Sequence, residues 1–183
     1  MKIRYNSPVV LTYTFLCIGV LIFSAQTGGW LIRNFFTVYP GVHPTEPLYY
    51  FRLVSFVAGH ANVGHLAGNF ALILLIGPLL EEKYGSWTLL QMILFTAVIT
   101  GILNSVMFST GLLGASGIVF MMILLSSFSN IKEGEIPLTF ILVALIYFGQ
   151  EIIQSLSKDN ISQFAHILGG VCGAGFGFLR IKD

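Results

Sequence analysis

Two short motifs carry groups that could do chemistry. The segment Gly114-Ala115-Ser116-Gly117 stands at the head of an apolar stretch, and His166 stands near the start of another. Hydroxyl and imidazole groups are costly to place in a bilayer, so within apolar stretches they are candidates for a functional site. Glycines let the backbone turn tightly, and a serine at a helix N-terminus has unpaired N–H groups beside it that suit an oxyanion. A serine nucleophile with a histidine base predicts hydrolysis where water is scarce. The alternative is a small-residue packing face.

A glycine stripe follows His166. Positions 166, 169, 173 and 177 are three and four residues apart, so they share one face of a helix, and they read His166, Gly169, Gly173 and Gly177. Small residues at this spacing let a second helix approach closely. A partner helix beginning at Ser116 would bring its hydroxyl to the imidazole, as a nucleophile and its base require. The alternative is a histidine that is simply hydrogen-bonded at the membrane rim.

His65 and Asn69 form a second polar pair. They are four residues apart and therefore share a helical face, and both can donate hydrogen bonds to a developing oxyanion. The alternative is a polar clamp between helices. A zinc site built from His60, His65 and His166 is disfavoured, because the chain has no HExxH pattern and the five-residue spacing of His60 and His65 predicts different faces. We therefore expect no metal.

Composition defines the class of protein that must position these groups. The 183 residues are 55% hydrophobic and 9% charged, with a mean hydropathy of +0.84, whereas soluble domains carry roughly 25% charged residues. A spanning helix needs about 20 mainly apolar residues. We expect an all-α membrane protein, with residues 1–183 forming a single domain. Its six candidate spans are Pro8–Gln26, Val54–Leu80, Trp87–Met107, Ser116–Phe128, Pro137–Leu156 and Phe164–Leu179.

Net charge and cysteine positions indicate which partners and cross-links to expect. A net charge of +1 offers no basic surface for nucleic acid. Cys17 and Cys172 both lie in predicted spans, where packing is favoured over a disulfide. The first apolar stretch is long enough to span and shows no convincing cleavage site, so we expect it to be retained. Bilayer contact is the main interaction that composition predicts.

Lysine and arginine positions predict the orientation. With a cytoplasmic N-terminus and six spans, the C-terminus is cytoplasmic too. Six of these residues then lie inside and three outside, which the positive-inside rule favours. In this arrangement Ser116, His166, His65 and Asn69 gather at similar depth in the outer half of the membrane. The function that follows is hydrolysis near the outer membrane face.

The long first loop, residues 28–50, is rich in aromatic residues. It holds Trp30, Phe35, Phe36, Tyr39, Tyr49 and Tyr50. Aromatic residues at this density suit the headgroup layer, so we expect the loop to be partly embedded in the membrane. Arg52, just after it, is expected to hold the loop by hydrogen bonds to backbone carbonyls.

The motifs together resemble the rhomboid family of intramembrane serine proteases, in its minimal six-helix bacterial form. The resemblance covers essentially the whole chain. Gly114–Gly117 matches the family's GxSG, residues 165–173 match AHxxGxxxG, and residues 65–69 match HxxxN. Phe51-Arg52 stands where the family often has Trp-Arg, and Gly77 to Glu81 with Gly85 closes the second span.

The resemblance implies a six-helix bundle with a partly embedded first loop, and a Ser–His dyad in place of a triad. Ser116 would be the nucleophile and His166 the general base and acid, with no cofactor. His65, Asn69 and the Ser116 amide would line the oxyanion hole. Gly114, Gly117, Gly169, Gly173, Phe120 and Arg52 would support the site. Substrates would be single-span membrane proteins cut near the outer face, and the expected location is the bacterial inner membrane.

Several points stay open at this level. Phe120 stands where many relatives carry tyrosine, which keeps the aromatic face and loses the hydroxyl. Glu151 is near the predicted depth of His166, but the family works without such an acid, so a place at the wet outer rim or facing the gap where substrate enters is favoured. Phe140, Tyr147 and Phe148 suggest the fifth span as a lateral gate, because large side chains there are expected to pack loosely compared with the glycine stripe of the sixth. A catalytically inactive relative and a small transporter are the alternative functions; the natural substrate and oligomeric state are not predicted.

Overall fold

The protein is built from helices. The computed structural model describes residues 2–128, 135–136, 138–155 and 160–180, without the side chains of 147–148, 150–155, 160–162 and 180. The elements are α1 (Pro8–Gln26), α2 (Trp30–Phe35), α3 (Pro47–Ser55), η1 (Phe56–Ala58), α4 (Val63–Tyr84), α5 (Ser86–Met107), α6 (Ser116–Ser126), α7 (Leu138–Ser155) and α8 (Asn160–Arg180). The described residues contain no β-strand beyond an isolated bridge between Val38 and Leu112. The all-α prediction is confirmed for this part of the chain.

Each predicted span overlaps one of the longer helices, although α4 and α8 extend beyond the predicted bounds. Helix α1 has the predicted bounds, and α5 begins one residue earlier than predicted. Helices α1, α4 and α5 are long and apolar enough to cross a membrane, while α6 and residues 163–179 of α8 form shorter apolar helices. The chain is therefore a helical, multi-pass membrane protein. Six crossings remain a prediction.

The second span was predicted to begin too early. Residues from Val54 onwards belong to α3 and η1, and the long helix α4 starts only at Val63. Gly59 is extended, and the Asn62 side chain caps α4 by accepting a hydrogen bond from the His65 amide at 2.9 Å. Mean hydropathy did not reveal this break, because Val54, Phe56, Val57 and Ala58 before it are mostly apolar. His65 and Asn69 consequently lie in the first two turns of α4.

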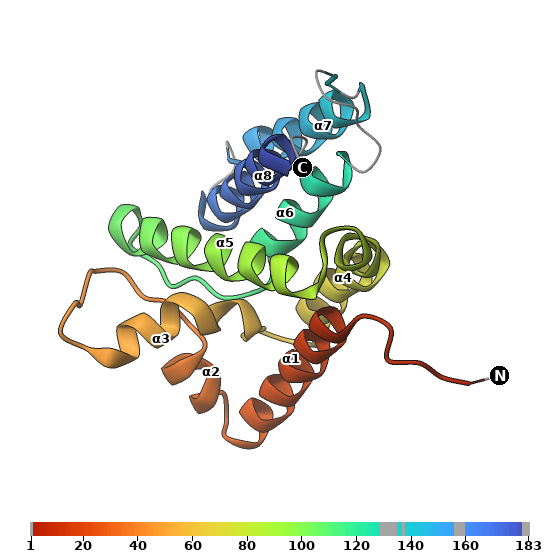
Figure 1. The fold of residues 1–183 in the computed structure, drawn as a ribbon. Helices are drawn as coiled ribbons and strands as arrows, with labels where there is room; N and C mark the ends of the chain where they lie inside the picture. Colours follow the sequence, from red (N-terminus) through yellow and green to blue (C-terminus); the bar gives the residue numbers. More distant parts are fainter. Residues whose placement is uncertain (1, 129–134, 137, 156–159, 181–183) are drawn as a thin grey trace.

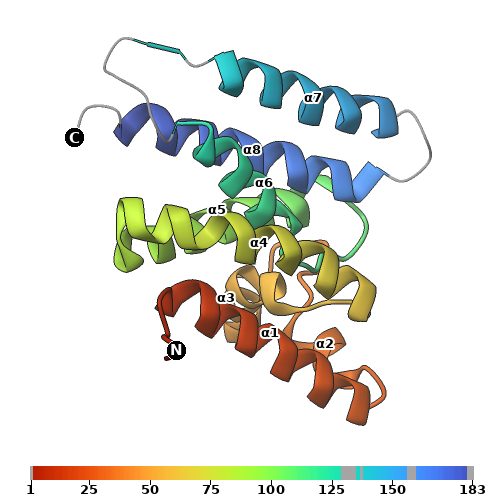
Figure 2. The same cartoon turned by 90° about the vertical axis from the view of Figure 1, so that its right-hand side faces the viewer.

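Helix α6 is the centre of the bundle. All its residues from Gly117 to Leu125 are buried, which is possible for a short helix only when neighbours surround it. It packs against α4, α5, α7 and α8, with its most extensive contact on α8. Figures 1 and 2 show α8 lying between α6 and the outermost helix α7, with α1 at the opposite edge. The helix that begins with Ser116 is thereby shielded by the rest of the fold.

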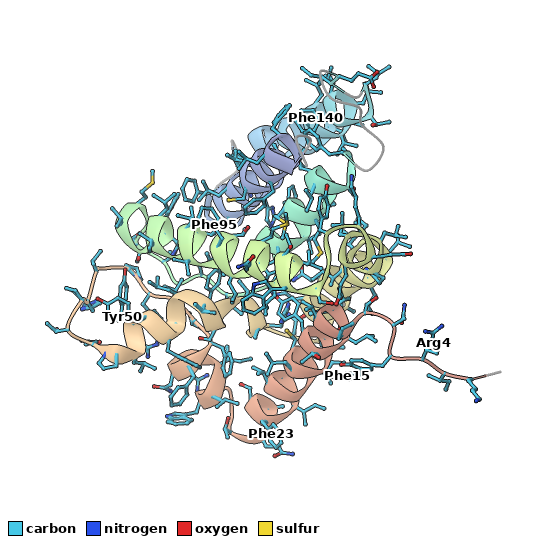
Figure 3. The ribbon with its side chains drawn as sticks, viewed as in Figure 1. Arg4, Phe15, Phe23, Tyr50, Phe95 and Phe140 are labelled. Atoms are coloured by element: carbon cyan, nitrogen blue, oxygen red, sulfur yellow. The ribbon has the colours of Figure 1, made fainter. Side chains whose placement is uncertain are left out.

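Helix α1 is anchored by a buried carboxylate. Glu81, in the last turn of α4, is 5% exposed and accepts hydrogen bonds from the Val9 and Val10 amides at 2.9 and 3.0 Å. The Ser86 hydroxyl donates a third at 2.7 Å. Because the first N–H groups of a helix have no partner within it, Glu81 caps α1 from a distant part of the chain. The exposed side chains Phe15 and Phe23 point away from the bundle (Figure 3).

Replacing Glu81 with glutamine is expected to destabilise the protein by roughly 1–3 kcal/mol, because an amide nitrogen would face amide donors in a buried site. Unfolding of the purified protein in detergent measures the effect. Glu82→Gln removes the neighbouring carboxylate, which is exposed, and should change stability little. Equal stability of the two variants would contradict this role of Glu81.

The first loop packs onto the bundle through α2 and α3. As predicted, the Arg52 Nε donates a hydrogen bond to a loop carbonyl, that of Asn34, at 2.8 Å. The Arg52 guanidinium also lies 5.4 Å from the centre of the Tyr39 ring. Of the six aromatic residues of the loop, Tyr49 is buried, whereas Trp30 and Tyr50 are more than half exposed. Embedding of this loop in the membrane remains a prediction.

Candidate active site

The segment preceding Ser116 is held by the first loop and η1. Val38 and Leu112 exchange two backbone hydrogen bonds of 3.0 and 2.9 Å, and the Gly114 amide donates to the Phe56 carbonyl at 3.0 Å. These bonds join parts of the chain more than fifty residues apart. The position of Ser116 therefore depends on the fold of residues 38–56 as well as on α6 itself.

Gly114 and Ser116 have the local structure that the motif predicted. Ser116 is the first residue of α6, with Ala115 as the N-cap. Gly114 has a φ of +117°, a conformation that residues with a side chain rarely adopt. A Cβ at Gly114 would also lie 2.7 Å from Cε1 of His65. The His65 ring therefore packs directly on the turn that leads into Ser116.

Helices α6 and α8 meet backbone to backbone along the glycine stripe. A Cβ at Gly169 would lie 2.0 Å from the Gly117 carbonyl oxygen, and one at Gly173 would lie 2.2 Å from that of Met121. The close approach predicted from the stripe is thus present. A Cβ at Gly117 would meet the Ala165 carbonyl at 3.2 Å, so Ser116 and His166, the sequence neighbours of Gly117 and Ala165, lie at the same end of this interface.

Phe120 and His166 stack face to face. Their ring centres are 4.3 Å apart and the ring planes differ by 5°. Phe120 is one turn after Ser116 on α6, so the stack fixes the imidazole plane relative to the serine helix. The ring contact expected between Phe120 and His166 is therefore present, and its role in the site stays a prediction.

Asn69 offers a hydrogen-bond donor next to this region. The residue is 8% exposed, and in the part of the chain that the structure describes its Nδ2 has no hydrogen-bond partner. An unsatisfied buried donor is unfavourable by about 1–3 kcal/mol, so such a group suits a ligand that arrives during function. His65, one turn earlier, is half-buried.

A small cavity lies behind Ser116. It is lined by Thr100 from α5, by Gly114 and Ser116, and by Ala165 from α8, and it has a volume of about 10 Å³ for the centre of a water-sized sphere. This is about the room that one water molecule needs. The Thr100 hydroxyl is buried and has no hydrogen-bond partner among the described residues. The cavity can therefore hold a single water beside the serine.

His60 is a site residue that sequence reasoning missed. It is fully buried, with Nδ1 3.3 Å from the Ala58 carbonyl oxygen and Nε2 3.4 Å from the Ala115 amide nitrogen. Because a carbonyl accepts and an amide donates, the neutral ring carries its proton on Nδ1. His60 thus holds the residue just before Ser116. Only its contact with Ala115, 55 residues away, reveals this role.

The predicted separation of His60 and His65 was wrong. Their ring centres are 5.0 Å apart, edge to face. His60 lies in the loop before α4, so helical spacing does not apply to the pair. Both nitrogens of His60 face backbone groups, which leaves neither for a metal. Among the residues that the structure describes, no group of three histidine, cysteine, aspartate or glutamate side chains could hold a metal ion.

Acidic conditions are expected to destabilise the fold through His60. Burial lowers the pKa of His60 from 6.5 to about 4; a charge on His65 acts in the same direction and the Ala58 carbonyl opposes both. Since the folded state has the lower pKa, the free energy of unfolding does not depend on the titration of His60 above about pH 6.5. It falls by roughly 2–3 kcal/mol as the pH drops towards 4, because the unfolded state then binds the proton more tightly.

Unfolding in detergent across that pH range, compared between wild type and His60→Gln, measures this contribution. The variant should show the flatter pH dependence. His43→Gln, which removes a histidine that is 53% exposed, should keep the wild-type slope. Parallel curves for wild type and His60→Gln would contradict the assignment.

Other predicted residues are only partly described. The side chains of Glu151, Tyr147 and Phe148 lie outside the described residues. Phe140 is half-buried and packs against Phe128 and Phe178, with ring centres 4.7 and 5.7 Å away, so it is not loosely packed. Cys17 and Cys172 are free thiols, as expected.

Comparison with known proteins identifies a family that the chain matches. Residues 47–183 match the family model of the rhomboid domain. The chain is 24% identical to Rhomboid protease GlpG of Haemophilus influenzae over 180 residues, which cover 97% of this chain and 93% of that protein. It is 29% identical to Rhomboid-related protein 1 of Caenorhabditis elegans over 143 residues, 72% of this chain and 40% of that longer protein.

The match spans well over half of the chain, and the chain belongs to the rhomboid family. Together with the relative named a rhomboid protease, this membership indicates a serine intramembrane protease, a hydrolase.

Proposed function

We propose that this protein is an intramembrane endopeptidase that cuts single-span membrane proteins near the outer membrane face with a Ser116–His166 dyad. The observation that carries the proposal is the backbone contact between α6 and α8. At Gly169 that contact leaves no room for a Cβ, and it sets the serine and the histidine at one end of the same interface. Glycine contacts are a means of holding a nucleophile and its base in register.

In the proposed reaction, the Ser116 Oγ attacks the scissile carbonyl carbon while His166 takes the hydroxyl proton. The carbon–nitrogen bond then breaks, and His166 returns the proton to the leaving amine. Water, for which the cavity beside Thr100 has room, attacks the acyl ester with His166 as base. This releases the new carboxyl group and restores the serine.

The developing oxyanion would be stabilised by the Ser116 amide, by Asn69 and by His65. The start of a helix presents N–H groups without intrahelical partners, and the buried Asn69 Nδ2 is available as a donor. His65 packs on Gly114, within reach of the same turn. Preorganised donors of this kind are the main source of transition-state stabilisation in acyl transfer.

Several finer features belong to the same proposal. We place six membrane crossings in the chain, both termini in the cytoplasm, the first loop partly in the outer leaflet and the lateral gate at α7, in the bacterial inner membrane. Charge bias supports the orientation. The peripheral position of α7 (Figure 2) and the exposed Leu142 and Leu145 on it support the gate.

Labelling with a fluorophosphonate tests the nucleophile without a known substrate. The reagent is expected to modify the wild-type protein at Ser116, as read by mass spectrometry of the labelled peptide. The His166→Ala variant should be labelled much more slowly. A catalytically inactive relative or a transporter would not be labelled at Ser116, and that outcome would overturn the proposal.

Phe120→Tyr is expected to keep cleavage activity within about one order of magnitude, because the ring stack on His166 is retained and only a hydroxyl is added. Phe120→Ala removes the stack and should reduce activity further. Initial rates on one transmembrane substrate in liposomes measure both variants. A collapse of activity in Phe120→Tyr would contradict a purely packing role.

A further inference from the structure

A long apolar groove separates α1 from α5 below the first loop. It has a volume of about 590 Å³. Its walls include Thr12 and Leu16 from α1 and Leu90 and Leu94 from α5, and Phe36 and Phe51 lie at its loop end. Helix α1 packs mainly on α4 and α2 and touches α5 only slightly. The groove is the space that this slight contact leaves between α1 and α5.

The polar groups that line this groove are satisfied by the protein itself. The Tyr13 hydroxyl donates to the Val57 carbonyl at 2.7 Å, and the Ser55 hydroxyl donates to the Phe35 carbonyl. The Thr12 hydroxyl is bonded to Tyr5 at 3.0 Å, and the Ser86 hydroxyl to Glu81. An occupant therefore needs no polar group within the groove, which is the property of a hydrocarbon chain.

The length of the groove fits one leaflet. Pro8 and Leu16 line one wall and Ser86 and Leu94 the other, and eight residues of helix extend about 12 Å. Half of a hydrocarbon core is roughly 15 Å. Phe36 and Phe51 close the far end of the groove, because the first loop packs against the helices there. A chain entering from the N-terminal end of α1 would thus fill the space beneath the loop.

The open end of the groove continues into a polar pocket of about 530 Å³. Pro8 and Ser86 line both spaces. Arg4 and Glu82 also line the pocket, and both are exposed; Arg4 lies on the N-terminal segment that leads away from α1 (Figure 3). Glu81 is already engaged by α1. Among the residues that the structure describes, the mouth of the apolar groove is thus lined by the cation of Arg4 and by the carboxylate of Glu82.

We propose that this groove and pocket bind one phospholipid with a zwitterionic, primary-amine headgroup from the leaflet at the N-terminal end of α1. An acyl chain lies in the groove, the phosphate faces Arg4 and the ammonium group faces Glu82. A primary ammonium can donate hydrogen bonds to a carboxylate, whereas a choline headgroup cannot. The proposal is independent of the proteolytic function.

Native mass spectrometry of the purified, delipidated full chain tests the site, with dioleoyl phosphatidylethanolamine, phosphatidylcholine, phosphatidylglycerol and oleic acid as probes. We expect one tightly bound phosphatidylethanolamine, preferred over phosphatidylcholine by about fivefold, the upper end of what an exposed charge pair contributes. Glu82→Gln should remove this preference, whereas Arg4→Gln should weaken the binding of both phospholipids. Lys2→Gln, which removes a charge from the same segment outside the pocket, should change neither.

Leu90→Trp fills the groove and should weaken lipid binding by about tenfold or more, because a packed site does not accept extra volume. Leu75→Trp makes the same change on the exposed face of α4, where Leu75 is 68% exposed, and should have no effect. Leu16→Trp, from the opposite wall, replaces Leu90→Trp if that variant does not fold.

Equal binding by the groove variants and Leu75→Trp would overturn the proposed site. A bound lipid with no headgroup preference, or equal binding of oleic acid, would overturn the assignment of the polar pocket.

Discussion

Ser116→Ala and His166→Ala are each expected to reduce cleavage of a transmembrane substrate by about a thousandfold or more. In the proposed dyad, Ser116 would supply the attacking oxygen and His166 would take its proton, so either substitution would remove a group that the reaction needs. The measurement is cleavage of one single-span substrate in liposomes, with equal amounts of folded enzyme confirmed by thermal unfolding.

The double variant sharpens this test. Residues that act as a unit have strongly non-additive effects, so Ser116→Ala combined with His166→Ala should be no slower than the single variants. Ser109→Ala changes an exposed serine in the loop before the site, and His43→Ala changes an exposed histidine. Both controls should cleave at the wild-type rate. Equal cleavage by wild type and the two single variants would contradict the proposed catalytic dyad.

The second large effect is expected from Gly169→Ala. Its new Cβ would lie 2.0 Å from the Gly117 carbonyl oxygen, and this neighbour is backbone that cannot rotate away. Helices α6 and α8 must separate at the level of Ser116 and His166. We expect a loss of roughly 1–3 kcal/mol of stability from overpacking, together with loss of most cleavage activity.

Gly175→Ala is the matched control for this change. Gly175 is on the same helix and has no atom within 4 Å of a Cβ built on it. The substitution should leave activity unchanged and stability equal or slightly higher, since alanine favours helices more than glycine. Unfolding in detergent and cleavage rates measure both variants. If Gly169→Ala behaved like Gly175→Ala, close packing of the two helices would not be required.

Local patterns predicted the parts of the fold that depend on local physics. The bounds of α1 were predicted correctly, because an apolar run follows Pro8 and proline suits the first position of a helix. The glycine spacing from Gly169 predicted a close helix contact, since residues three and four apart share a face. The start of α4 was missed, because hydropathy does not distinguish the apolar end of α3 and η1 from a continuous span.

The sequence by itself determined the class of protein, the glycine face of α8 and the residue types Ser116, His166, His65 and Asn69 that could do chemistry. Only the tertiary structure decided what holds them. The Ala115 contact of His60, the Leu112 bridge to Val38 and the capping of α1 by Glu81 join residues 55, 74 and more than 70 positions apart. Hydrogen bonds between such distant residues leave no periodic signal, because they depend on where the folded chain brings donors and acceptors together.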